Sequence, residues 1–184
     1  TCALPIFMCL RSMSFVARTH DMDRKHMMET FRRAHDHKGA AFVEIYQNCN
    51  VFNDGAFDLL REKPQGVHNQ IRLEHGQPVI FDEGTRCVAI GPNGRLGIAD
   101  VADVDRDRIV VHDAAGDPSL AFSLANLSSG PTQPTCIGVF RDVERGVYGE
   151  AMLAQIDQTT ERLGKGSLEK LLRSGDTWQV PARA

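Results

Sequence analysis

The first clear pattern of apolar and polar positions spans residues 21–46. Asp21 or Asp23 can cap a helix, and apolar residues follow at helical spacing until Gly39, which indicates the end of that helix. The spaced apolar positions are Met27, Met28, Phe31 and Ala34. Residues 40–46 then form a short apolar run, which predicts a buried strand. A helix that leads directly into a buried strand is typical of a parallel, doubly wound α/β sheet.

Beyond Asp54 the pattern changes to short apolar runs separated by turn residues. We expect an irregular polar linker over 59–69, a loop over 128–135, and a series of short strands around them. The expected strands are two within 71–81, followed by 87–90, 96–101, 108–112, 120–124 and 136–142. Near the end of the chain, Met152, Ile156 and Leu163 mark a helix, and Ser167 caps a shorter one. The sequence therefore predicts an α/β chain whose second part is rich in strands and ends in two helices.

Composition argues against several classes of function. The net charge of −3 gives no basic footprint for nucleic acid, and no segment approaches the roughly 20 apolar residues that span a bilayer. The apolar run over 3–10 contains Pro5 and lacks a preceding positive charge. It is therefore a poor signal peptide, and we expect a cytoplasmic location. The five cysteines are irregularly spaced, which argues against a disulfide framework, a zinc ribbon or a Cys-x-x-Cys redox site.

Cys49 is the main candidate for chemistry. It follows the strand predicted over 40–46 and lies in an asparagine-rich turn, where ligands of parallel sheets gather. The residues alone leave three interpretations open. Cys49 is a buried structural thiol, a free redox thiol of lowered pKa, or a thiolate ligand of an iron–sulfur cluster completed by distant cysteines. In the last case, N–H groups of the turn would bind cluster sulfur.

Other polar residues are weaker candidates. Two groups have metal-capable side chains but are interpreted as parts of a solvated helix face. The first group comprises His20, Asp21, Asp23 and His26, and the second is His35-Asp36-His37. His112-Asp113 could form a general base with its orienting carboxylate, although a turn is the favoured interpretation. Cys87 and Cys136 lie in expected strands, and we expect them to be core thiols.

A series of short sequence words, occurring in one order from Phe15 to the end of the chain, carries a family resemblance. The words are Phe15-Val16-Ala17-Arg18, Asp23-Arg24-Lys25-His26, His37-Lys38-Gly39, the runs 42–49, 52–57 and 73–78, His112-Asp113, Gly138-Val139-Phe140-Arg141 and Gly175-Asp176-Thr177-Trp178. Together they resemble the β subunit of bacterial 2-oxoacid:ferredoxin oxidoreductases, most closely the type that acts on 2-oxoglutarate. The first fourteen residues do not match.

This resemblance implies an oxidative decarboxylation. Such enzymes act on a 2-oxoacid with thiamine diphosphate and Mg²⁺, pass electrons through a four-iron four-sulfur cluster to ferredoxin, and release an acyl-coenzyme A. They combine the β subunit with an α subunit. The resemblance makes Cys49 the last cysteine ligand of the cluster, the other three belonging to the upstream half of the subunit. The motif that holds the magnesium and the diphosphate belongs there as well.

That cofactor motif, Gly-Asp-Gly…Asn, is absent from this chain. Gly116-Asp117-Pro118 and Gly175-Asp176-Thr177 both break it at the third position. The chain therefore resembles the C-terminal half of the subunit. Residues 1–58 correspond to the last units of a thiamine-diphosphate-binding fold, and residues 59–184 to a β-rich extension. No catalytic residue is expected within the chain, and the isolated chain is expected to be inactive. The alternative is a non-catalytic remnant or a subunit-assembly module.

Overall fold

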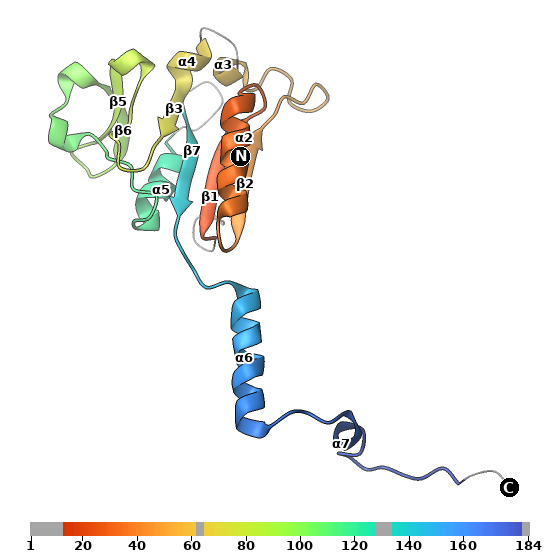
Figure 1. Ribbon diagram of the computed structural model, residues 1–184. Coiled ribbons are helices and arrows are strands. Elements are labelled where there is room, and N and C mark those ends of the chain that lie inside the picture. The colour runs from red at the N-terminus through yellow and green to blue at the C-terminus, as the bar shows by residue number, and fades with distance from the viewer. Residues whose placement is uncertain (1–12, 62–64, 128–133, 182–184) are drawn as a thin grey trace. The chain divides into compact units, whose positions relative to one another are not determined.

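The computed structural model describes residues 13–61, 65–127 and 134–181 (Figure 1). It divides into two compact units, one ending at Arg145 and the other beginning at Gly146. The loop expected over 128–135 and the divergent first fourteen residues lie largely outside the described residues.

A four-stranded mixed sheet forms the centre of the first unit. Its strands are β1 Phe15–His20, β2 Ala41–Tyr46, β3 Gln70–Leu73 and β7 Thr135–Asp142, in the order β2-β1-β7-β3. β1 is parallel to β2 and β3 is parallel to β7, but β1 and β7 run antiparallel. The α/β class is therefore confirmed, whereas the expectation of a purely parallel sheet is wrong, because β7 enters the sheet in the opposite direction to β1.

Helix α2, Arg24–Asp36, connects β1 to β2 as expected. Asp23 caps it by accepting the His26 backbone N–H at 3.0 Å. The predicted apolar stripe is only partly covered: Ala34 packs against buried residues of the sheet, but Phe31 and Met28 are exposed. The prediction of a buried strand over 40–46 is also wrong in its burial. Among the described strands β2 pairs with β1 alone, at the edge of the sheet, and its residues are half-buried or exposed.

The segment after the β2 loop is not an irregular linker. It contains two short helices, α3 Asp58–Arg61 and α4 Gln65–Asn69. Phe57 and Leu60 are buried there, at 9% and 1% exposure. These two apolar side chains hold the segment against the rest of the first unit. The mostly polar sequence over 59–69 does not indicate this contact.

A second, three-stranded antiparallel sheet follows. It comprises β4 Ile80–Phe81, β5 Arg86–Ile90 and β6 Leu96–Asp100, in that order, which confirms the expected strands there. Three 3-10 turns accompany it: η1 Asp82–Gly84, η2 Val101–Asp103 and η3 Arg106–Arg108. The strand expected over 108–112 is wrong, because that segment makes only isolated bridges, from Ile109 to Ala89 and from Val111 to Pro78.

The strand expected over 120–124 is a helix instead. Helix α5, Pro118–Ala125, begins with a proline and is capped by Asp117, which accepts the Ser119 N–H. Its buried residues are Ala121, Leu124 and Ala125. A short apolar run is compatible with either a buried strand or a buried helix, and here the Asp-Pro start decides for the helix.

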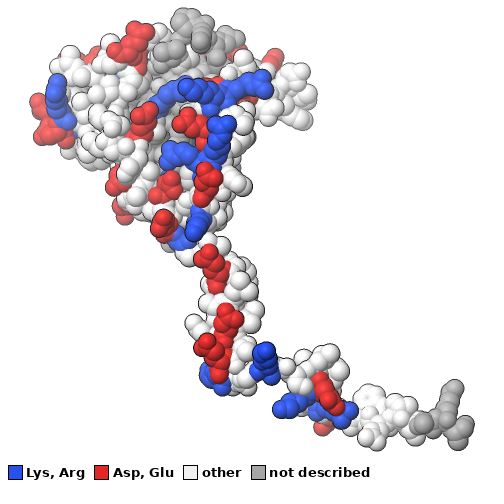
Figure 2. Space-filling model, in the orientation of Figure 1, with Lys and Arg blue, Asp and Glu red and all other residues white. Residues whose placement is uncertain are grey.

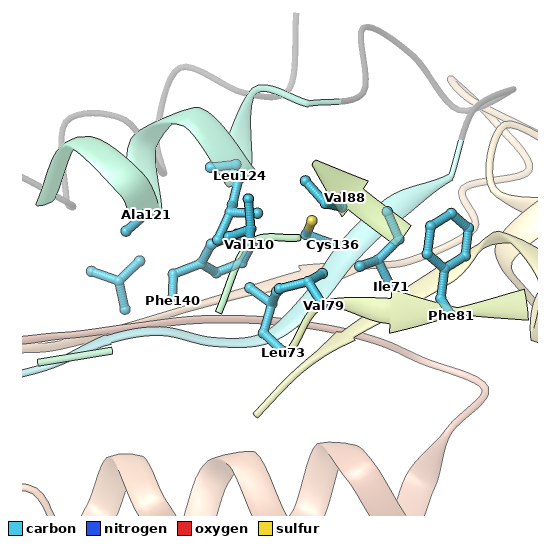
Figure 3. Close-up of a cluster of buried hydrophobic side chains, with 12 residues drawn as sticks. Ile71, Leu73, Val79, Phe81, Val88, Val110, Ala121, Leu124, Cys136 and Phe140 are labelled. Carbon is cyan, nitrogen blue, oxygen red and sulfur yellow. The ribbon is translucent and has the colours of Figure 1, made fainter. Parts of the chain in front are cut away.

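One hydrophobic core joins both sheets and α5 (Figure 3). Ile71 and Leu73 of the first sheet, Val88 of the second and Leu124 of α5 all belong to it. Residues on both sides of position 58 therefore share a sheet and a core. The division into a cofactor-binding part over 1–58 and an extension over 59–184 remains a prediction.

The second unit contains the two expected C-terminal helices, α6 Tyr148–Leu163 and α7 Leu168–Leu172. Ser167 caps α7 by accepting the Lys170 N–H. Figure 2 shows acidic side chains along α6 and both basic and acidic ones around α7. None of the residues from 146 to 181 is buried. Among the helices that the structure describes, none has the length and apolar character to cross a membrane.

Candidate functional site

Cys49 lies in the loop that leaves the carboxyl end of β2. This segment, residues 47–57, is called the Cys49 loop below. It sits beside the carboxyl end of β1, because the Asp21 N–H donates to the Tyr46 carbonyl at 3.0 Å, and the Asn48 N–H lies 3.4 Å from an Asp21 carboxylate oxygen. Cys49 therefore stands at the carboxyl ends of the two parallel strands, as expected from the sequence.

Aromatic stacking closes the base of the Cys49 loop. The ring of Tyr46, which precedes the loop, is stacked on the ring of Phe57, the last residue of the loop, with centroids 4.5 Å apart and planes inclined by 14°. The Arg18 guanidinium lies 4.9 Å from the centroid of the Tyr46 ring. Because Phe57 is buried, this stack anchors both ends of the loop to the first unit.

A second closure lies nearer to the cysteine. Asn48 Nδ2 donates to Asp54 Oδ1 at 2.9 Å, and the Gly55 N–H donates to Asn48 Oδ1 at 2.9 Å. Within the closed segment, the Asn53 N–H donates to the Cys49 carbonyl at 2.8 Å. Gly55 has φ +72°, a conformation that side-chain-bearing residues rarely adopt.

The loop lowers the pKa of the Cys49 thiol. The backbone N–H groups of Phe52, Val51 and Asn53 favour the thiolate, and their effect outweighs partial burial and the negative charge of Asp54. Cys49 is half-buried, while the side chains of Val51 and Phe52 are exposed. The interpretation of Cys49 as a buried structural thiol is therefore wrong.

The other two described cysteines differ from Cys49. Cys87 and Cys136 are buried, which confirms that they are core thiols. Burial raises the pKa of both thiols, that of Cys136 to about 12. Figure 3 shows the Cys136 sulfur among apolar side chains of the core. Of the described cysteines, Cys49 alone has an environment that favours the thiolate.

The Cys49 environment fits a ligand of an iron–sulfur cluster, since N–H groups that donate to a cysteine sulfur stabilise its charge and tune the bound cluster. The described residues do not complete such a site, because no three of their His, Cys, Asp or Glu side chains are grouped to hold a metal ion. The same finding gives no fit to the magnesium of a thiamine diphosphate site, which requires several fixed oxygen ligands.

The histidines near the carboxyl end of β1 are structural. His20 is buried, with Nε2 3.0 Å from Gln70 Nε2, and His26 Nδ1 lies 2.8 Å from Thr19 Oγ1. Burial lowers the pKa of both imidazoles, so their neutral forms are favoured. The expectation of a solvated helix face is wrong for His20, because β1 carries it into the interior, whereas His26 is half-buried on α2.

The second metal-capable group is also divided. His35 and Asp36 are exposed, as expected. His37 instead contacts Asp142 through Nδ1 at 3.0 Å and Ser14 through Nε2 at 2.8 Å. It therefore connects the end of α2 to the ends of β7 and β1.

His112 and Asp113 do not act together in the structure. His112 is fully buried, and its Nε2 contacts the Val139 carbonyl at 2.8 Å. Burial lowers the pKa of its imidazole. Asp113 accepts the Ala115 N–H and lies 3.5 Å from His75 Nδ1. The arrangement provides no base with an orienting carboxylate, and His112 is an interior anchor.

Arg18 is the site residue that sequence reasoning missed. Its side chain is 1% exposed, and Nε contacts Glu44 Oε2 at 2.6 Å while Nη1 donates to the Cys136 carbonyl at 3.3 Å. The guanidinium also lies 5.2 Å from the centroid of the Phe140 ring. Arg18 therefore supports Tyr46, and through it the base of the Cys49 loop. A signal was present, because Arg18 and Glu44 are single charges at paired positions of two apolar strands.

Comparisons with known proteins agree with the sequence resemblance. No family model matches the chain. The 2-oxoglutarate oxidoreductase subunit KorB of Mycobacterium tuberculosis is 41% identical over 171 residues, which are 91% of this chain and 45% of the relative. The 2-oxoacid:ferredoxin oxidoreductase subunit beta of Saccharolobus solfataricus is 39% identical over 51 residues, covering 27% of this chain and 17% of the relative.

A solved structure shows the same fold. It is a 2-oxoglutarate:ferredoxin oxidoreductase from Magnetococcus marinus, determined with 2-oxoglutarate, coenzyme A and succinyl-CoA bound. The match has a TM-score of 0.54 at 18% identity and covers 94% of this chain and 44% of that chain. The chain spans less than half the length of the curated relatives that it matches. Its similarity to the β subunit of 2-oxoglutarate oxidoreductase nevertheless extends over most of its own length, which confirms the resemblance.

Proposed function

We propose that this chain is part of the β subunit of a 2-oxoacid:ferredoxin oxidoreductase, with 2-oxoglutarate as the 2-oxoacid. The complete enzyme would oxidatively decarboxylate the 2-oxoacid, form an acyl-coenzyme A and pass the electrons to ferredoxin. Its α subunit would be the partner of this chain, and its location would be cytoplasmic. The names of the two curated relatives support the proposal, one of which matches 91% of this chain.

Cys49 is proposed as one ligand of the iron–sulfur cluster of that enzyme. The observation that carries this assignment is the place of Cys49 at the carboxyl ends of two parallel strands, in a loop that leaves its side chain half-buried. Backbone N–H groups of the loop, first that of Phe52 and then that of Val51, lower the pKa of the thiol and favour the thiolate, which is the form that binds iron. The cluster, when bound, would supply a one-electron carrier between the oxidised substrate and ferredoxin. The remaining ligands would come from sequence outside this chain.

Thiamine diphosphate and Mg²⁺ belong to the proposed complete enzyme but not to the described part of this chain. The Gly-Asp-Gly…Asn motif is missing from the sequence, and the described residues offer no grouped oxygen ligands for the metal. We therefore assign no cofactor-binding or catalytic residue here. The isolated chain is expected to be inactive, because its proposed part is to hold one corner of the cluster and to contact other subunits.

A subunit-assembly module is the second candidate function. The second unit favours it, because large apolar side chains there are exposed, including Leu153, Leu171 and Trp178. Apolar side chains gathered on an exposed surface commonly mark contacts with another protein. Such a module would assemble with an α subunit without contributing a ligand to iron.

The test is the assembled enzyme, made anaerobically from this chain, an α subunit and the polypeptide that supplies the rest of the β subunit. We expect Cys49→Ser to lose cluster iron, visible absorbance and ferredoxin reduction with 2-oxoglutarate. Asn50→Ser, in the same exposed loop, is the matched control and should keep all three. Retention of iron and ferredoxin reduction by Cys49→Ser would remove Cys49 from the cluster. Assembly of an iron-free, inactive complex by the unaltered chain would favour the assembly module.

A further inference from the structure

A series of hydrogen bonds connects four elements of the first unit near the carboxyl end of β1. Asp23, the cap of α2, accepts from Arg72 of β3, whose Nη2 lies 2.6 Å from Oδ2. The same Nη2 donates to Gln70 Oε1 at 2.9 Å. Gln70 Nε2 in turn lies 2.7 Å from the Leu60 carbonyl oxygen and 3.0 Å from His20 Nε2. The Gln70 side chain therefore joins the end of α3 to the end of β1.

The orientation of the Gln70 amide follows from the chemistry of two of its neighbours. A guanidinium only donates hydrogen bonds, so the Gln70 atom beside Arg72 must be the oxygen. A backbone carbonyl only accepts, so the atom beside Leu60 must be the nitrogen. The second N–H of that nitrogen is left to donate to His20 Nε2. His20 is therefore neutral in this arrangement and carries its proton on Nδ1.

Protonation of His20 conflicts with this arrangement. The cation has a proton on both ring nitrogens, so its Nε2–H would face an N–H of Gln70. Its Nδ1 is buried and has no hydrogen-bond partner among the described residues. The cation gains an acceptor from Gln70 only when the amide turns over, and the amide then loses its bonds to the Leu60 carbonyl and to Arg72.

The charged groups around His20 do not remove this conflict. Asp21 follows it in the chain, Asp23 and His26 lie at the start of α2, and Arg72 lies on β3. Burial lowers the pKa of His20 and outweighs the two carboxylates, which act in the opposite direction. The closed arrangement is therefore fully stable above about pH 6.5, the ordinary value, and its stability falls as the pH drops below it.

We propose that His20 and Gln70 form a proton-operated latch, in which neutral His20 lets the Gln70 amide hold the end of α3 against β1, and protonated His20 turns the amide and releases α3. Helix α3 begins directly after Phe57, the last residue of the Cys49 loop, whose ring is stacked on Tyr46. Release of α3 would therefore loosen the segment that anchors this loop. The latch is independent of the proposed function, because no iron, substrate or partner takes part in it.

Site-resolved NMR of the full chain tests the latch. Near pH 8, where histidine is neutral, the ring-nitrogen shifts of His20 should show a proton on Nδ1 and none on Nε2. As the pH falls, the His20 ring, the Gln70 side-chain amide and the carbonyl carbon of Leu60 should titrate with one midpoint below about 6.5. Backbone amide signals of β5 and β6 should not change at that midpoint.

Three results of this titration would overturn the latch. They are a proton on Nε2 of neutral His20, a Leu60 carbonyl signal that does not follow the His20 titration, and the loss of all signals of the first unit at that midpoint. The last result would mean that protonation unfolds the unit instead of releasing α3.

A change of Gln70 tests the donor. Gln70→Glu places an acceptor beside His20, so it should raise the pKa of His20 by about one to two units, as an opposite charge in contact does. Gln77→Glu adds the same charge at an exposed position of the first unit and should leave that pKa unchanged. An unchanged or lowered pKa in Gln70→Glu, or an equal rise in both variants, would contradict the latch.

A change of His20 tests the proton. His20→Gln keeps an oxygen that can accept from Gln70 but removes the group that titrates. The carbonyl carbon signal of Leu60 should then stay constant over the range in which it titrates in the unaltered chain. His112, the other fully buried histidine, is intact in this variant. If the Leu60 signal still titrates as before, another group controls α3 and the latch is refuted.

Discussion

Removing the buried charge of Arg18 without removing that of Glu44 should strongly destabilise the first unit. The Arg18 side chain is 1% exposed and that of Glu44 is 11% exposed, with Nε and Oε2 separated by 2.6 Å. At that separation the attraction is about 6 kcal/mol for an effective dielectric constant of about 20. Dehydration of the two charges opposes it, so the measurable quantity is the cost of leaving one charge unpaired, about 3–5 kcal/mol.

A double-mutant cycle measures this cost. Arg18→Met and Glu44→Leu should each lower the free energy of unfolding by about 3–5 kcal/mol. The double variant removes both charges and leaves only the Cys136 carbonyl without its donor, so it should lose less, about 1–3 kcal/mol. Urea unfolding near pH 7 should be followed by far-UV circular dichroism, because Trp178 lies exposed in the second unit and would not report on this pair. Additive losses, or single losses below about 1 kcal/mol, would refute the reasoning.

Three further predictions concern other parts of the first unit. Gly138→Ala should lower the free energy of unfolding by at least about 2 kcal/mol, measured by urea unfolding, because φ is +110° and a Cβ would stand 2.8 Å from the Leu73 carbonyl oxygen. Stability should fall as pH drops below about 6.5, since burial lowers the pKa of His112 and protonation therefore favours the unfolded chain; His112→Gln should flatten this slope in unfolding curves from about pH 8 to about pH 5.5. Iodoacetamide should modify Cys49 much faster than Cys136 near neutral pH, as read by site-resolved mass spectrometry, and equal rates would contradict the two thiol environments.

Much of the fold was predictable because local signals agree with the final structure. Helix α2 follows a capping aspartate, and β5, β6 and β7 are apolar runs bounded by turn residues. The failures occur where tertiary contacts decide. The apolar run of α5 is helical because Asp117 and Pro118 start it and the core covers one side. The segment after the Cys49 loop is helical because Leu60 is buried.

The candidate site divides in the same way. The place of Cys49 follows from the strand that precedes it, so the sequence locates the thiol at the carboxyl end of β2. The side chain of Asn48 contacts Asp54 and Gly55, six and seven residues later, and sequence spacing does not give that geometry. Arg18 was missed because its partner Glu44 lies on a neighbouring strand, and the pairing becomes evident only with the register.

The place of β7 in the first sheet has a consequence for biosynthesis. β7 lies between β1 and β3, although both of those strands are made long before it. While the ribosome is still making the residues before 135, β1 and β3 each lack a neighbour on the side that β7 will occupy. Unpaired strands of this kind invite association between nascent chains. Closure of the sheet must await a strand from far along the polypeptide, which favours slow folding and gives chaperones a window in which to act.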